Sequence, residues 1–278
     1  MTRDCTLGEM MVASIARTVE DGTLAFHGFG SPLVQLALLV AKGTHAPDLV
    51  LVAGATYGIN PKPPFLTPTS NDWVMDRGAE LSLDIEELFD LAGSGRMGRM
   101  FLSGLQIDKW GNCNVTMLGK DRMSMKLPGG GGGCNLSCDA GALTLWTGAH
   151  ASRPDPKGRR RYRLVDECDF ITNFGHRDAE GRNRASLGHL GGGPEWLVTD
   201  MGVFDFDEEG HARLCEIRHG LTVEDVQEST GFPLRVSPDL RTVPVPDPEI
   251  CQLIRRLDPL GIHLNEIQPG DRALRFAA

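Results

Sequence analysis

Helix-like and strand-like segments alternate over the first fifty residues, and this order restricts the fold more than any other feature of the chain. Residues 7–21 place apolar side chains on one helical face and end at Asp21-Gly22. Residues 23–26 then predict a short strand that runs into the turn Gly28-Phe29-Gly30. A strand that ends in a glycine turn is the usual beginning of a strand–helix connection.

A second helix and a second strand follow this turn. Ser31 is a predicted N-cap, and Pro32 suits the first turn of a helix over residues 33–42. The apolar run 49–53 is typical of a buried parallel strand. The order of these elements predicts an α/β fold with an open, mostly parallel sheet flanked by helices.

The remainder of the chain continues with short elements of both kinds. Helices are predicted at 85–92, 223–229 and 248–257, and strands at 100–103, 142–146, 170–172, 196–199, 202–206 and 212–217. No shift in composition marks a linker. We therefore expect a single domain over residues 1–278, with residues 244–278 as a C-terminal extension.

Charge and cysteine content exclude several classes of protein. The formal net charge is −9, which disfavours nucleic-acid binding because phosphates are neutralised by a surplus of Lys and Arg. The longest apolar run, residues 33–41, is interrupted by Gln35 and is too short to span a bilayer. The 7 cysteines include no CxxC pair, which predicts neither a disulfide framework nor a metal site. We expect a cytoplasmic protein that binds no nucleic acid, membrane or metal.

Two glycine clusters are candidates for binding an oxyanion. Backbone N–H groups at Gly28 and Gly30 could hold a phosphate, a carboxylate or a thioester oxygen, although this pair taken alone favours a tight turn without a ligand. The run of five glycines at 129–133 is more specific, since each glycine adds flexibility that folding must remove. We expect Gly130, Gly131 and Gly132 to approach a ligand with their backbone.

A polar loop follows the predicted strand at 100–103. It carries four compact polar side chains, Gln106, Asp108, Asn112 and Asn114. Such side chains either stabilise turns or contact substrate. The sequence context favours turn stabilisation, and the four residues stay candidates for a substrate pocket.

The order of several motifs resembles the β subunits of family I CoA-transferases, most closely the glutaconate CoA-transferase type. The similarity covers roughly residues 8–258 in a consistent order. The matching segments are His45-Ala46-Pro47-Asp48, Gly104-Leu105-Gln106-Ile107-Asp108, Trp110-Gly111-Asn112-Cys113-Asn114, the glycines 129–133, Arg159-Arg160-Arg161-Tyr162, Val198-Thr199-Asp200-Met201-Gly202-Val203-Phe204, Leu221-Thr222-Val223-Glu224-Asp225-Val226 and Thr230-Gly231-Phe232.

This resemblance implies a fold, a substrate class and a partner. The implied fold is the open α/β fold of the NagB/RpiA/CoA-transferase superfamily. The implied substrate is an acyl-CoA thioester, with coenzyme A as part of the substrate and no permanently bound cofactor. The implied partner is a homologous α subunit, in a heterodimer or a heterotetramer, with the active site between the subunits.

One departure from the family concerns the catalytic nucleophile. In the transferases, a Glu after the strand that follows Ala-Pro-Asp forms a thioester with coenzyme A. The resemblance places Gly54 at this position, and the adjacent Thr56 and Tyr57, candidates for the substrate pocket, supply no carboxylate. Glu80, Glu86 and Glu87 lie too far along the chain to replace it.

Three functions follow as expectations. The first is a β-type subunit of a heteromeric enzyme of the CoA-transferase family that acts on an acyl-CoA. The second is a ring-opening hydrolase or a glutaconyl-type CoA decarboxylase in which the α subunit supplies the Glu. The third is a scaffold subunit without catalytic function, which the retained glycine clusters argue against.

Overall fold

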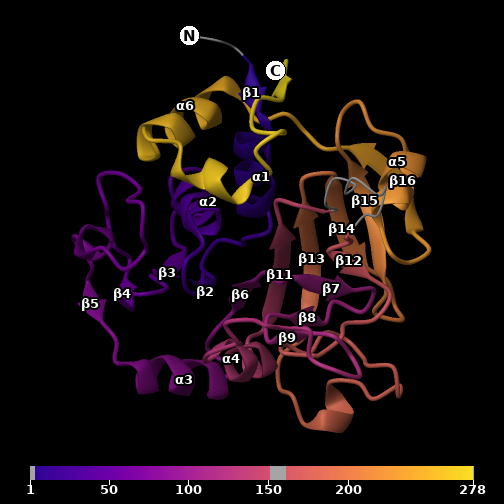
Figure 1. Cartoon of the computed structure of the whole chain (residues 1–278). Helices are drawn as coiled ribbons and strands as arrows, with labels where there is room; N and C mark the ends of the chain where they lie inside the picture. Colours follow the sequence, from indigo (N-terminus) through magenta and orange to yellow (C-terminus); the bar gives the residue numbers. More distant parts are fainter. Residues whose placement is uncertain (1–3, 151–160, 278) are drawn as a thin grey trace. The chain divides into compact units, whose positions relative to one another are not determined.

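The computed structural model describes residues 4–150 and 161–277, and these residues form two compact units. The first unit combines residues 1–101 with residues 244–278, and the second unit comprises residues 102–243. Each unit contains both helices and strands (Figure 1). The chain passes from the first unit into the second after residue 101. It returns to the first unit at residue 244, shortly before the last α-helix, Pro248–Leu257.

The first unit contains four α-helices and short strands among its described residues. Its helices are α1 (Leu7–Ala16), α2 (Pro32–Lys42), α3 (Ile85–Gly93) and α6 (Pro248–Leu257), with the 3-10 helices η1 (Trp73–Asp76) and η3 (Ile262–Glu266). Its strands are β1 (Cys5–Thr6), β2 (Leu24–Phe26), β3 (Val50–Val52), β4 (Gly58–Ile59), β5 (Leu81–Ser82), β6 (Arg99–Leu102) and β17 (Arg275–Phe276). Helices α1, α2 and α6 pack on one another.

Local sequence fixes where the first helices begin. The Thr6 hydroxyl accepts the Glu9 N–H, and the Glu9 carboxylate accepts the Thr6 N–H, which makes a capping box at the start of α1. The Ser31 hydroxyl accepts the N–H of Val34 and caps α2, with Pro32 at its first position as expected. Both helices bury nearly all their side chains, so tertiary packing stabilises them more than intrinsic propensity does.

Strands of the first unit lie in the order β6-β2-β3-β4-β5. Strand β2 pairs in parallel with both β3 and β6, while β4 pairs antiparallel with β3 and with β5. The parallel pairs consist mainly of buried or partly buried apolar residues, with the buried Arg99 of β6 opposite Ala25 as the exception. Because β2 and β3 run in parallel, the turn after β2 and the turn after β3 leave the sheet at the same edge.

The second unit is built mainly from strands. They are β7 (Gln106–Asp108), β8 (Cys113–Asn114), β9 (Met117–Leu118), β10 (Met125–Lys126), β11 (Ala142–Thr147), β12 (Leu164–Val165), β13 (Pro194–Thr199), β14 (Gly202–Phe206), β15 (Ala212–Ile217) and β16 (Arg235–Thr242). Helices α4 (Gly133–Asp139) and α5 (Val223–Ser229) and the 3-10 helix η2 (Ala185–Leu187) complete the unit.

Five of these strands follow one another in the order β16-β15-β14-β13-β11 (Figure 1). The pairs β11–β13 and β15–β16 are parallel, and β13–β14 and β14–β15 are antiparallel. A smaller sheet has the order β12-β7-β8, and β9 pairs with β10. The antiparallel meander β13–β15 comes from three predicted strands joined by tight turns.

Most predicted elements are confirmed, and so is the α/β class; the sheet predicted to be mostly parallel also contains antiparallel pairs. The strand predicted at 170–172 is wrong, because Thr172 and Asn173 bond to Cys113 across a loop instead of entering a ladder. Helix α4 and strand β16 were not predicted. No helix among the residues described is long and apolar enough to cross a membrane.

Residues 244–278 do not behave as an appendage. Helix α6 packs on α1 and α2, η3 contacts α2, and β17 pairs with β1, so the segment is part of the first unit's core. The Glu266 carboxylate also reaches the start of α2 and accepts the N–H of Leu33 at 2.7 Å. The expectation of a single domain over residues 1–278, with residues 244–278 as a C-terminal extension, stays a prediction.

Candidate functional site

His27, Gly28 and Gly54 meet at the edge of the first unit's sheet, where β2 and β3 end. His27 Nε2 accepts the backbone N–H of Gly54 at 2.9 Å, so the neutral ring carries its proton on Nδ1. Burial lowers the pKa of His27 to about 4. His27 is therefore a neutral hydrogen-bond acceptor that fixes the turn after β3 against the turn after β2.

Position 54 has no room for a side chain. A Cβ atom added to Gly54 would overlap the carbonyl oxygen of Gly28 and lie 2.8 Å from Cε1 of His27. The obstacle is backbone and a buried ring, neither of which can move aside cheaply. The position to which the family resemblance assigns the catalytic Glu is thus closed by close backbone approach.

The turn Gly28-Phe29-Gly30 needs both of its glycines. Gly28 has φ of 71° and Gly30 has φ of 69°, in the left-handed region that favours glycine. The N–H of Gly30 donates to the Ser70 hydroxyl at 3.2 Å. A ligand oxyanion at this N–H would have to replace the Ser70 hydroxyl, so the oxyanion role of Gly28 and Gly30 stays a prediction.

Thr56 and Tyr57 lie in the turn directly after Gly54. Tyr57 has φ of 57°, which is uncommon for a residue with a side chain, and its ring contacts the exposed ring of Phe29 edge-to-face, with centroids 6.0 Å apart. The Thr56 hydroxyl is buried without a hydrogen-bond partner in the part of the chain that is described. These features identify the 54–57 turn as a constrained segment beside the glycine turn.

Glu266 was not predicted as part of this region. Its Oε2 accepts the N–H of Leu33, in the first turn of the helix that follows the glycine turn. Burial raises the pKa of Glu266 to about 8, although the Leu33 bond opposes the shift. No sequence signal links Glu266 to Leu33, because only folding brings the C-terminal segment to the start of α2.

The glycine run lies in the second unit. Gly129 has φ of 91° and Gly131 has φ of 52°, and a Cβ at Gly130 would lie 2.7 Å from Cγ2 of Thr172. Gly132 is the N-cap of α4, and Gly133 begins that helix. The run is therefore an ordered turn into a helix, and its role in oxyanion binding stays a prediction.

The polar loop residues of the second unit are saturated by the chain's own groups. Asp108 is buried and accepts the N–H groups of Trp110 and Asn112 as well as the Asn112 side-chain amide. Burial raises the pKa of Asp108 to about 6 against these hydrogen bonds. Such bonding favours the turn-stabilising interpretation.

Asn114 and Gln106 form a second group of the same kind. The Asn114 amide donates to Gln106 Oε1 at 2.7 Å and to the carbonyl oxygen of Met117, and Gln106 Oε1 also accepts the N–H of Asp169. The structure places this group in the second unit, and Gly28, Gly30, Gly54, Thr56 and Tyr57 in the first. A substrate-contacting role for Gln106, Asp108, Asn112 and Asn114 stays a prediction.

Carboxylates near Gly54 in sequence have structural partners. Glu80 accepts the side-chain amide of Asn60, and Glu87 closes a capping box with Asp84 at the start of α3. Part of the basic segment that resembles the family, Arg159-Arg160, lies outside the described residues. Within the described ranges, one cluster has potential metal-ligand atoms within 4.8 Å of one another, and it consists of Cys5, Glu9 and Cys251.

Comparison with known proteins places the chain in a family. Residues 8–229 match the family model described as Coenzyme A transferase. The B-type subunit of the glutaconate CoA-transferase of Acidaminococcus fermentans is 29% identical, over 94% of this chain and 92% of its own length. The IpdB component of the cholesterol ring-cleaving hydrolase of Rhodococcus jostii is 26% identical, over 85% of this chain and 87% of its own length.

A solved structure gives the same answer for the fold. The decarboxylase AibA/AibB includes a chain that is 30% identical, with a TM-score of 0.78, over 94% of this chain and 98% of that one. The glutaconate coenzyme A-transferase of Acidaminococcus fermentans has a structure with a TM-score of 0.75 and 24% identity, over 95% of this chain and 98% of that one, and it confirms the predicted CoA-transferase fold. Taken together with the family match over most of the sequence, these likenesses show that this chain belongs to the Coenzyme A transferase family and is similar to its B-type subunits.

Proposed function

We propose that this chain is the B-type subunit of a heteromeric enzyme that acts on an acyl-CoA without forming a covalent intermediate on this chain. The observation that carries the proposal is the close approach of Gly54 to the carbonyl oxygen of Gly28, which leaves no space for a side chain at position 54. A glycine offers no carboxylate to attack a thioester, so any catalytic carboxylate comes from the partner. Coenzyme A enters as part of the substrate, and no resident cofactor is required.

The relatives support non-transferase chemistry as well as a partner. The 30%-identical structure is a decarboxylase of two components, AibA and AibB, and IpdB is a component of a hydrolase. Decarboxylation of an acyl-CoA is the first candidate because of the AibA/AibB likeness. Hydrolytic ring opening of an acyl-CoA is the second candidate, on the likeness to IpdB.

The glycine turns fit the chemical demand that both reactions share. Each reaction passes through negative charge on the thioester oxygen, as an enolate or dienolate, and backbone N–H groups stabilise such charge when they are fixed in place beforehand. Gly28, Gly30 and the glycines 130–132 are the proposed donors. The ring of His27 keeps the turn after β3 close to Gly28, which would exclude water from that side of the thioester.

The test is to produce this chain together with an α-type partner and to supply acyl-CoAs, glutaconyl-CoA first. We expect release of CO₂ or a hydrolysed product, and unchanged intact masses of this chain after borohydride treatment. An adduct on this chain would refute the absence of a covalent step. A third outcome is transfer of coenzyme A to a free acid, with an adduct on the partner alone. This outcome would overturn the decarboxylase and hydrolase chemistry, and the assignment as a B-type subunit would stand.

A matched pair of substitutions separates a catalytic role from a scaffold role. Gly131 and Gly95 both have positive φ, with values of 52° and 72°, and neither has a neighbour within 4 Å of an added Cβ. Both Gly131→Val and Gly95→Val therefore carry similar backbone strain. If Gly131 faces substrate, only Gly131→Val abolishes turnover of the complex, and equal activity of the two variants would favour a scaffold.

A further inference from the structure

The two ends of the chain bring two buried thiols together in the first unit. The Sγ atoms of Cys5 and Cys251 and a carboxylate oxygen of Glu9 lie within 4.8 Å of one another. Cys5 belongs to β1 and is fully buried, and Cys251 belongs to α6 with 3% of its surface exposed. Two thiols from opposite ends of a sequence meet at this distance only because α6 packs beside α1.

An ion pair between Arg255 of α6 and Glu9 of α1 holds α6 beside the N-terminal segment. Arg255 Nε donates to Glu9 Oε1 at 2.5 Å, and Arg255 also donates to the carbonyl oxygen of Asp4 at 2.8 Å. Arg255 lies one helical turn after Cys251, and Asp4 directly precedes Cys5. The contacts that orient Arg255 therefore also fix the distance between the two sulfur atoms.

We propose that Cys5 and Cys251 form a reversible disulfide when the protein meets a peroxide. The Sγ atoms of Cys5 and Cys251 lie within 4.8 Å of each other. A disulfide has an S–S length of about 2.0 Å, so the two sulfurs must move closer by less than about 3 Å. Cys5 lies in the two-residue strand β1, so closure requires a shift of this short strand relative to α6. The bond would join the N-terminal strand to the C-terminal helix.

The electrostatic surroundings assign roles to the two thiols. A hydrogen bond with Cys5 lowers the pKa of the Cys251 thiol, against the effect of burial. The same hydrogen bond and burial raise the pKa of Cys5. Cys251 is thus the thiol that ionises first, and Cys5 is the partner that resolves its oxidised form.

The oxidation balances with hydrogen peroxide as the oxidant. The Cys251 thiolate attacks one peroxide oxygen, an S–O bond forms, the O–O bond breaks, and the leaving hydroxide takes up a proton as water. The Cys5 sulfur then attacks the Cys251 sulfenic acid, the S–S bond forms, the S–O bond breaks, and a second water leaves with the Cys5 proton. Two thiols and one peroxide give one disulfide and two waters.

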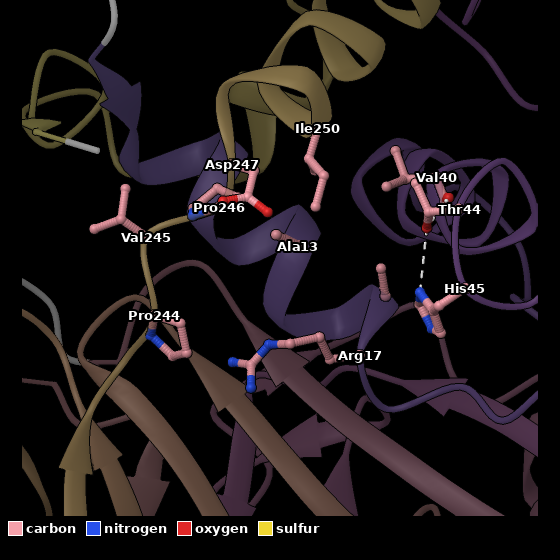
Figure 2. Close-up of a pocket in the computed structure, with 11 residues that line it drawn as sticks. Ala13, Arg17, Val40, Thr44, His45, Pro244, Val245, Pro246, Asp247 and Ile250 are labelled. Atoms are coloured by element: carbon pink, nitrogen blue, oxygen red, sulfur yellow. Dashed lines mark hydrogen bonds between the residues drawn. The ribbon is translucent and has the colours of Figure 1, made fainter.

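A cavity of the first unit is lined in part by residues close to Cys251 in the sequence. It has a volume of about 280 Å³ and is lined by residues of α1 and α2, by the segment that leads into α6, including Pro246, and by Ile250 of α6 itself (Figure 2). Cys251 follows Ile250 directly, and its sulfur lies 3.8 Å from the carbonyl oxygen of Pro246. In this proposal, a small oxidant reaches the Cys251 thiol from the cavity.

The Glu9 carboxylate argues against a metal ion in the same place. Glu9 Oε1 is paired with Arg255, and Glu9 Oε2 accepts the N–H of Thr6 and a second N–H of Arg255. A metal would have to displace a guanidinium that stabilises both ends of the chain. The paired carboxylate leaves the two sulfurs as the reactive atoms of the cluster.

Peptide mapping of the folded protein tests the proposal. Trypsin releases Cys5 in the peptide 4–17 and Cys251 in the peptide 242–255. After mild hydrogen peroxide treatment we expect these peptides as one disulfide-linked species that dithiothreitol separates, together with a rise in the unfolding temperature of roughly 5–10 °C. Cys5→Ser and Cys251→Ser should lose both effects, and Cys215→Ser, in the second unit, should keep both.

Three results would overturn the proposal. One is a link between these peptides that forms only after denaturation in urea. Another is conversion of Cys251 to sulfinic or sulfonic acid without any linked peptide in the wild-type protein. The third is one zinc ion per chain that purifies with the protein and is lost in Cys5→Ser, which would make the cluster a metal site.

Discussion

The imidazole of His27 accepts the backbone N–H of Gly54 at 2.9 Å, and this bond joins the two turns that leave the same edge of the first unit's sheet. The ring is buried, and burial lowers its pKa to about 4, so it remains a neutral acceptor at physiological pH. Close approach of Gly54 to Gly28 is a consequence of this arrangement. The geometry that removes space for a nucleophile is thus maintained by a specific side chain.

Gly54→Ala should destabilise the protein by about 2 kcal/mol or more, because the added Cβ overlaps the carbonyl oxygen of Gly28. Gly93→Ala is the matched control, since Gly93 ends α3 with open space around an added Cβ, and its stability should change by less than about 1 kcal/mol. Urea denaturation monitored by circular dichroism measures both. Equal stability of the two variants would show that the turn at Gly54 relaxes freely.

His27→Phe should cost roughly 1–3 kcal/mol, because it leaves the buried N–H of Gly54 without an acceptor. His27→Gln offers a side-chain oxygen in a similar place and should retain part of this stability. Hydrogen exchange at the Gly54 amide provides the direct measurement, with faster exchange expected in His27→Phe than in His27→Gln. Identical exchange in the two variants would contradict the proposed anchoring role.

The partly buried carboxyl of Glu266 should make the stability of the protein depend on pH. Its pKa is about 8 in the folded protein, above the ordinary value of 4.5, so the folded state retains a proton that the unfolded state loses. The contribution of Glu266 to stability should therefore fall as pH rises from 4.5 to 8. Glu266→Gln should unfold at a higher temperature than the wild type near pH 8, with a flatter pH profile.

Glu228→Gln is the control for this profile, because Glu228 is an exposed glutamate on α5. Its unfolding temperature should follow that of the wild type across the same pH range. A Glu266→Gln profile that also coincides with the wild type would show that Glu266 is ionised in the folded protein.

Asp108→Ala should destabilise the protein by roughly 3 kcal/mol, since it leaves the N–H groups of Trp110 and Asn112 and the Asn112 amide without their acceptor. Asp108→Asn keeps one oxygen and should cost less. Denaturant midpoints and turnover of the assembled enzyme distinguish the possible roles. Loss of turnover in Asp108→Asn without a change in stability would instead support a contact with substrate.

Regular elements of the chain followed closely from local sequence. Ser31 and Pro32 determined where α2 begins, and the apolar run at 49–53 determined the buried strand β3, because caps and hydrophobic periodicity act over a few residues. The strands Gly202–Phe206 and Ala212–Ile217 were predicted to the residue for the same reason. The order of these elements indicated an open α/β fold, and the order of the motifs indicated the family.

Contacts at the candidate site depended on chain segments that are distant in sequence. The sequence by itself determined that position 54 is a glycine, and that this position corresponds to the family's nucleophile stays a prediction from the resemblance. Only the tertiary structure decided that position 54 is closed by the carbonyl oxygen of Gly28, that Glu266 reaches Leu33, and that Cys5 meets Cys251. Local propensities determine where helices and strands form. The three contacts arise from packing between elements that are distant in sequence, and short-range sequence patterns carry no signal for such packing.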